Sequence, residues 1–182
     1  MDEFPEILQY VCSYLNEQGI DYVIVGGVAV MYYGVPRTTV DIDILLQINE
    51  PAINPFSEFL ISKGFDASAD DMRAAFAECS HSTVFYMDSA LRLDIQGINS
   101  QFDQMTIDRA VTIDFFDVML KLGTVEDTLI NKILFQGEQD LRDAHGIYRI
   151  NQELLNLEYI EDTCNMLGIF EKWTAFLTET DF

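Results

Sequence analysis

The sequence has 182 residues, 49% of them hydrophobic, and carries 10 lysines and arginines against 31 aspartates and glutamates, for a formal net charge of −21. This length fits one domain, or one domain with a helical extension. The acidic excess disfavours strong binding to duplex DNA, which depends on neutralising phosphates with lysine and arginine. The charge favours solubility and is compatible with a basic partner.

The cysteines and the apolar stretches indicate a soluble cytoplasmic protein. Cys12, Cys79 and Cys164 are odd in number and form no CxxC or Cys/His cluster, which is typical of reduced thiols. The N-terminus is acidic and lacks the basic region of a signal peptide. The longest uncharged apolar stretch, residues 22–36, is interrupted by glycines and is shorter than the roughly 18 residues of a membrane span. We therefore expect no membrane association.

Helical and strand patterns alternate through residues 1–122. The predicted helices are 4–18, 28–34, one that begins at Pro51 or Pro55 and runs to Gly64, and 70–79. The predicted strands are 21–25, about 37–47, 82–88, 91–98, and one or two within 111–122. The segment 100–110 is ambiguous. Strands 82–88 and 91–98 are separated by two residues, which predicts a hairpin-like pairing.

From Thr124 onward the pattern is helical. Thr124 with Asp127 suggests an N-cap and a capping box. The helical segments that follow are 125–136, 138–150, 156–169 and 170–180. We predict an α+β fold with a small mixed sheet flanked by helices over 1–122, followed by a helical subdomain over 123–182 that packs on it.

Two aspartates lie inside an apolar run. Asp41 and Asp43 are two residues apart, so in a strand they share one face with Arg37 and Thr39. Their carboxylates would repel each other unless a cation sits between them. The alternative is a half-exposed strand with solvated acids and a neighbouring arginine.

A third acid, Asp94, lies between two apolar residues of a later strand. If that strand neighbours the strand of Asp41 and Asp43, three carboxylates converge into a hard oxygen site suited to Mg²⁺ or Mn²⁺. Such ions brace the attacking and leaving oxygens in phosphoryl transfer. The turn at Gly26 and Gly27 would bring backbone N–H groups toward phosphate oxygens, or is simply a tight turn.

The segment VIVGGVAVMYYGVPRTTVDIDILL resembles the signature of the nucleotidyltransferase superfamily with the DNA polymerase β-like fold, and within it the small prokaryotic group of AbiEii-type and MenA-like toxins. The matching positions are Gly26, Gly27, Arg37, Thr39, Asp41 and Asp43, with Asp94 as the third carboxylate. The resemblance implies a nucleotidyltransferase core over 1–122. One departure is Val28, which stands where many members have a serine that holds a phosphate.

The segment VEDTLINKILFQGEQDLRDAHGIYR is similar to a helical segment of the same family, with matches at Glu126, Lys132, Asp140 and Asp143. The resemblance implies that Lys132 lies near the site and is held by Asp140 or Asp143. The alternatives are that Lys132 extends into solvent and that the two acids form a solvated face or caps.

The implied activity is Mg²⁺- or Mn²⁺-dependent transfer of a nucleoside monophosphate from an NTP such as ATP to a protein, tRNA or small-molecule hydroxyl, with release of pyrophosphate. Asp41 and Asp43 would bind metal, and Asp94 would act as general base or ligand. The residues that would bind the nucleotide are Gly26, Gly27, Arg37, Thr39 and Lys132. The alternative is a catalytically weak or silent binding module, such as one half of a toxin–antitoxin pair with an antitoxin-like partner.

Overall fold

The structure, a computed structural model, describes residues 3–180, and within this range it has nine helices and a seven-stranded mixed sheet. The fold is α+β, as predicted. Residues 1–2 and 181–182, which the predicted domains included, lie outside the described residues. In the described part of the chain, no helix combines the length and the apolar character needed to cross a membrane.

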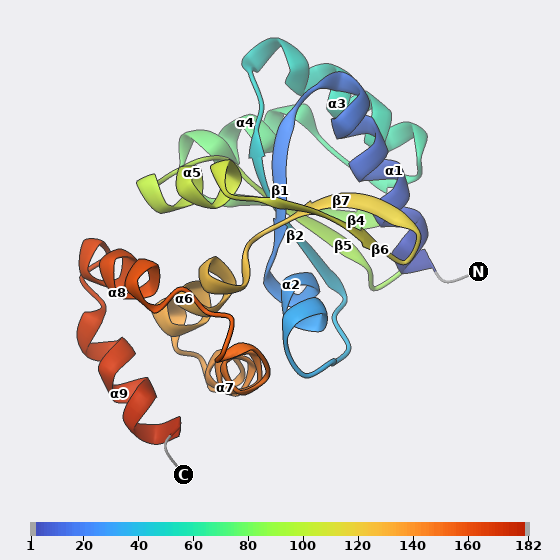
Figure 1. Cartoon of the computed structure of the whole chain (residues 1–182). Helices are drawn as coiled ribbons and strands as arrows, with labels where there is room; N and C mark the ends of the chain where they lie inside the picture. Colours follow the sequence, from blue (N-terminus) through green and yellow to red (C-terminus); the bar gives the residue numbers. More distant parts are fainter. Residues whose placement is uncertain (1–2, 181–182) are drawn as a thin grey trace. The chain divides into compact units, whose positions relative to one another are not determined.

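The elements follow one another in the order shown in Figure 1. The strands are β1 (Asp21–Val25), β2 (Asp41–Gln47), β3 (Phe65–Asp66), β4 (His81–Tyr86), β5 (Arg92–Gln96), β6 (Val111–Phe115) and β7 (Val118–Leu122). The helices are α1 (Glu3–Gln18), α2 (Gly26–Tyr33), α3 (Glu50–Ser62), α4 (Ala69–Ala77), α5 (Gln101–Asp108), α6 (Val125–Phe135), α7 (Glu138–Asn151), α8 (Leu157–Met166) and α9 (Phe170–Thr180).

The chain forms two compact units that do not follow the sequence order. One unit comprises the residues up to Val28 together with Thr39–Gly123, and the other comprises Ala29–Thr38 together with the chain from Thr124 onward. We call them the sheet unit and the helical unit. The sequence predicted a division after residue 122 and did not foresee that residues 29–38 join the helical unit.

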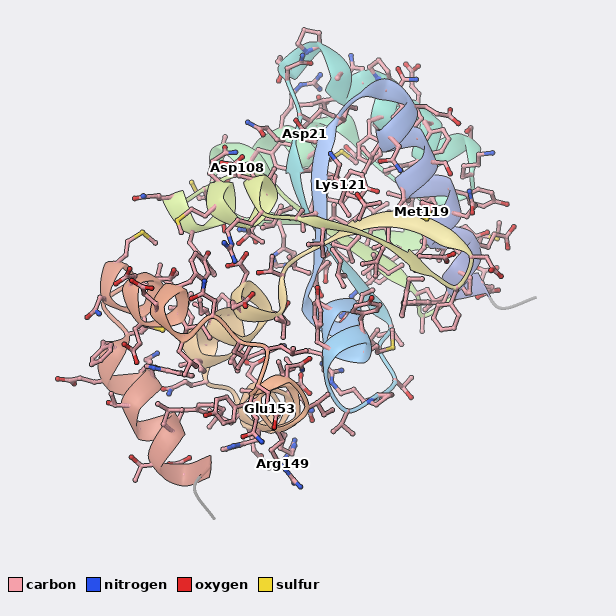
Figure 2. The ribbon with its side chains drawn as sticks, viewed as in Figure 1. Asp21, Asp108, Met119, Lys121, Arg149 and Glu153 are labelled. Carbon is pink, nitrogen blue, oxygen red and sulfur yellow. The ribbon has the colours of Figure 1, made fainter. Side chains whose placement is uncertain are left out.

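The sheet has the strand order β3-β4-β5-β2-β1-β7-β6. Strand β2 is parallel to β5 and antiparallel to β1, and β4 pairs antiparallel with β5 as the hairpin prediction required. At β1 and β7, Lys121 donates a hydrogen bond of 2.8 Å from Nζ to Asp21 Oδ1 (Figure 2). The pairings with β1 and β5 place the central strand β2 between these two strands.

One face of the sheet is apolar because alternate residues of the central strands are apolar. Ile42 and Ile44 of β2 lie beside Leu93 and Ile95 of β5, and all four are buried. Helices α1, α3 and α4 pack on the sheet and are grouped on one side of it in Figure 1. Burying this face fixes the register, since a shift of one residue would place the acids of β2 in the core.

The opposite face of the sheet carries the acids of β2. On this face, Leu45 packs with Val23 of β1 and with Ile107 of α5 in a small apolar cluster. Asp41 and Asp43 precede Leu45 in the same row of alternate residues. Helix α5 thus covers one end of the row, and the two acids occupy the other end.

The helical unit is held by caps and by an aromatic core. The Thr124 side chain accepts a hydrogen bond of 3.1 Å from the Asp127 backbone N–H, which confirms the predicted N-cap of α6. Trp173 and Phe176 of α9 stack with ring centroids 5.9 Å apart, and Tyr148 of α7 meets both rings edge-on. Each of the four helical segments predicted after residue 123 contains a helix in the structure, α6 to α9.

The strand predicted over about 37–47 begins only at Asp41, so the prediction that Arg37 and Thr39 extend the same strand face is wrong. Residues 35–40 have no regular secondary structure. Pro36 cannot donate a ladder hydrogen bond. Arg37 instead binds Asp143 within the helical unit, and Thr39 packs against Gly27.

Candidate active site

Three aspartates lie on one face of two neighbouring parallel strands. The register pairs Asp43 of β2 directly with Asp94 of β5, and Asp41 lies two residues before Asp43. Thr83 of β4 donates a hydrogen bond of 2.6 Å from Oγ1 to Asp94 Oδ1. The register therefore places Asp94 on the same face as Asp41 and Asp43, and Thr83 fixes one of its oxygens.

An arginine that sequence reasoning missed lies among these acids. Arg92 is paired with Asp41 across the β2–β5 register, and its Nη2 atom lies 2.6 Å from Asp41 Oδ1. Its Nε atom lies 3.7 Å from Asp94 Oδ2. The signal was present in the sequence, because Arg92 is two residues before Asp94 and shares its face.

Among the described residues, the carboxylate face offers a divalent cation one suitable oxygen but no complete set of ligands. Within the described residues, no group of three or more His, Cys, Asp or Glu side chains is arranged to hold a metal ion. The predicted three-carboxylate site is thus not preassembled, since the Arg92 guanidinium contacts both Asp41 and Asp94. However, Asp41 Oδ1 is buried and has no hydrogen-bond partner. A buried carboxylate oxygen that only an ionic contact compensates fits a hard cation such as Mg²⁺.

The glycine pair lets two polar side chains approach the backbone at the start of α2. Gly26 has φ +59°, and a Cβ atom there would lie 1.9 Å from Asp43 Oδ2. A Cβ atom on Gly27 would lie 2.6 Å from Thr39 Oγ1, and the Gly27 N–H lies 3.4 Å from Asp43 Oδ2. The pair is therefore required for the packing of Asp43 against Gly26 and of Thr39 against Gly27.

The packing at Gly27 predicts a selective loss of stability in Gly27→Ala. The new methyl group must displace Thr39, and overpacking of this kind costs about 1–3 kcal/mol. Gly123→Ala is the matched control, because its Cβ atom would meet its nearest neighbour at an ordinary 3.6 Å. Urea unfolding of both variants measures the difference. Equal stability of the two variants would show that Thr39 is not held against Gly27.

The helical unit contains a cluster of two cations and two acids. Arg37 Nε and Nη2 each lie 3.0 Å from an oxygen of Asp143. Lys132 Nζ lies 2.8 Å from Asp140 Oδ1 and 3.5 Å from Asp143 Oδ2. Lys132 is therefore held by both acids that the sequence singled out, and it is not a solvent-extended lysine, since its side chain is only 13% exposed.

Asp143 is the centre of this cluster. Its side chain is 3% exposed and also accepts a hydrogen bond of 2.8 Å from Gln139 Nε2. Burial alone would raise the pKa of Asp143, but the hydrogen bonds from Arg37 and Gln139 and the charges of Arg37 and Lys132 outweigh burial and hold this pKa below its usual value. Asp143 therefore remains ionised at neutral pH and binds both cations.

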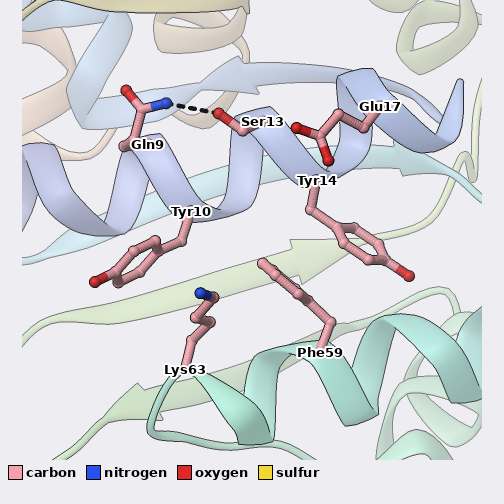
Figure 3. A pocket seen from close by; sticks show the side chains of 7 residues that line it. All are labelled: Gln9, Tyr10, Ser13, Tyr14, Glu17, Phe59 and Lys63. Carbon is pink, nitrogen blue, oxygen red and sulfur yellow. Dashed lines mark hydrogen bonds between the residues drawn. The ribbon is translucent and has the colours of Figure 1, made fainter.

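A separate groove of about 340 Å³ lies between α1 and α3 in the sheet unit (Figure 3). Lys63 Nζ lies 4.7 Å from the centroid of the Tyr10 ring, and Tyr14 stacks on Phe59 at 4.1 Å. Both helices pack on the apolar face of the sheet. The groove is therefore distinct from the carboxylate face.

Solved structures with this fold include nucleotidyltransferases. The antigenic nucleotidyltransferase-like protein from Paracoccidioides brasiliensis has a TM-score of 0.58 at 18% identity, with coverage of 97% of this chain and 93% of that chain. The antibiotic-resistance factor ANT(2'')-Ia has a TM-score of 0.58 at 11% identity, with 98% of each chain covered. The lincosamide antibiotic adenylyltransferase LnuA has a TM-score of 0.53 at 16% identity, with 78% and 94% covered. At these identities the likeness shows the fold.

A family model gives the membership of the chain. No curated protein matches the sequence. The model described as nucleotidyl transferase of unknown function (DUF2204) matches residues 5–168, a range that contains the three aspartates of the sheet unit and the Arg37–Lys132 cluster. Because this match spans most of the sequence, the chain belongs to the nucleotidyl transferase family DUF2204.

Proposed function

We propose that the protein is a divalent-metal-dependent nucleotidyltransferase that moves a nucleoside monophosphate from an NTP to an acceptor hydroxyl. The observation that carries the proposal is the register of β2 and β5, which places Asp41, Asp43 and Asp94 on one face in a chain of this family. Two points stay predictions from the sequence. One is the class of the acceptor, which is a protein, a tRNA or a small molecule, and the other is membership of the toxin-type group.

The acids divide the work between metal binding and proton transfer. Asp41 and Asp43 would hold Mg²⁺ or Mn²⁺, and the bound ion would neutralise phosphate charge as the leaving group departs. Asp94 would accept the proton of the acceptor hydroxyl. The hydroxyl oxygen then bonds to the α-phosphorus, the bond from this phosphorus to the bridging oxygen breaks, and pyrophosphate leaves. Thr83 occupies Oδ1 of Asp94, so Oδ2, which lies 3.7 Å from Arg92 Nε, would be the oxygen that takes the proton.

In this proposal, Arg37 and Lys132 would bind the phosphates, as the family resemblance at these positions implies. Arg37 and Lys132 are both fixed by Asp143, so binding an NTP would cost little of their side-chain entropy. Their positive charge is largely balanced by Asp140 and Asp143. We therefore expect them to orient the triphosphate by hydrogen bonding more than to attract it from a distance.

Calorimetry with ATP and with CTP, each with Mg²⁺ and with EDTA, tests the proposal. We expect binding that depends on the metal, followed by transfer of label from an α-labelled NTP to a protein or RNA of a cell lysate. Asp43→Asn is the matched variant, because it removes one charge and preserves the shape of the side chain. Metal-independent binding, or labelling that persists in Asp43→Asn, would refute the proposal.

A further inference from the structure

We propose that Arg92 is an internal cation that holds the carboxylates in the absence of metal, and that a divalent ion must displace it. The inference rests on the proposed metal-binding role of Asp41, Asp43 and Asp94. It adds a residue that opposes metal binding and so sets the metal concentration at which the site assembles.

The contacts of Arg92 place its charge inside the carboxylate group. Nη2 lies 2.6 Å from Asp41 Oδ1 and Nε lies 3.7 Å from Asp94 Oδ2, so one guanidinium spans two of the three acids. Without a cation, the neighbouring carboxylates would repel each other. Arg92 offsets part of that repulsion from within the chain.

The bond to Asp41 is of a kind that a metal can replace. Asp41 Oδ1 is buried and lacks a hydrogen-bond partner, although Arg92 Nη2 lies close to it. The contact is therefore ionic without hydrogen-bond geometry. A divalent ion offers this oxygen twice the charge and has no directional requirement at the oxygen. The greater charge of the ion favours its exchange for the guanidinium at this oxygen, against the cost of removing water from the ion.

The surroundings of Arg92 allow its side chain to move away from Asp41 and Asp94. Its side chain is 35% exposed, so it can move into solvent without breaking the core. The β4–β5 register pairs it with Phe85, whose ring is exposed on the same face. A guanidinium stacks favourably on an aromatic ring, which gives the displaced side chain a nearby surface.

The test is a titration of Mn²⁺ into the full chain without nucleotide, in which electron paramagnetic resonance measures how much Mn²⁺ is bound. Arg92→Gln should bind Mn²⁺ about two- to fivefold more tightly, the scale expected for the loss of a partly exposed ion pair. In EDTA the same variant should melt earlier than the wild type, and Mn²⁺ should raise its melting temperature by more. Arg92→Lys, which keeps a charge but cannot span two acids, should change affinity in the same direction by less.

Arg73→Gln is the matched control. Arg73 also spans two carboxylates, with 2.6 Å to Glu50 and 3.0 Å to Asp70, and its side chain is 30% exposed. It lies among residues of α3 and α4, so its loss should leave Mn²⁺ affinity unchanged.

The outcomes separate this inference from the proposed function. If the wild type binds Mn²⁺, Asp41→Asn loses that binding, and Arg92→Gln binds no more tightly than the wild type, the inference about Arg92 is overturned and the metal site stands. Weaker binding in Arg92→Gln would overturn it too, because Arg92 would then organise the acids for the metal. If neither the wild type nor Arg92→Gln binds Mn²⁺, the proposed function itself fails.

Discussion

Asp94→Asn is expected to lower nucleotidyl transfer by about a hundred- to ten-thousand-fold, the range that a positioned general base contributes. Asparagine has the shape of aspartate, and its amide oxygen can still accept the hydrogen bond from Thr83. The strand pairing of Asp94 with Asp43 should persist, since it depends on the backbone. What is lost is the oxygen that takes the proton. The measurement is the release of pyrophosphate from the NTP that the wild type uses.

Metal affinity then separates the two roles that Asp94 could have. If Asp94 is the general base, Asp94→Asn should keep NTP and Mn²⁺ binding close to the wild type. If it is a metal ligand, Mn²⁺ affinity should fall together with transfer. Asp66→Asn is the control, because Asp66 is an exposed aspartate on β3, at the edge of the same sheet. Wild-type transfer in Asp94→Asn would remove Asp94 from the mechanism.

Local patterns predicted the elements where one signal dominates. β1 has the predicted bounds, because a β-branched run ends at two glycines. The Thr124 cap was readable because its partner lies three residues away. Helix α5 was left ambiguous, and it is set by the Ser100 N-cap and by burial of Ile107 in the apolar cluster beneath it. Such burial depends on tertiary packing, which no local pattern contains.

The site was predictable in its residue types and less so in its connections. Alternation placed Asp41 and Asp43 together, but the bond of Arg37 to Asp143 joins residues 106 positions apart. That contact joins residues 29–38 to the helical unit, and β2 begins only after them, at Asp41. Arg92 was overlooked because its significance depends on pairing with Asp41, which becomes visible only with the β2–β5 register.

Asp143→Asn is expected to destabilise the protein at pH 7 by about 2–4 kcal/mol, because it removes the buried charge that pairs with Arg37 and Lys132. The Asp143 carboxylate accepts from Arg37 on both oxygens and also from Gln139. An asparagine amide replaces one of these oxygens with a donor that faces other donors. For a chain of this size the change corresponds to a fall of about 5–15 °C in melting temperature.

The pH dependence of this difference follows from the lowered pKa of Asp143. A carboxyl group whose pKa is lower in the folded state stabilises the fold fully above its unfolded pKa of about 3.9, and the contribution disappears as the pH falls through the folded value. The difference in unfolding free energy between the wild type and Asp143→Asn should therefore be constant from pH 6 to 8, because this range begins about two units above the unfolded pKa. In acid the difference should become smaller, because Asp143 is protonated there. Asp140→Asn, at a side chain that is 26% exposed, should show a smaller gap. A gap that stays constant into strong acid would mean that the Asp143 charge does not hold Arg37 and Lys132.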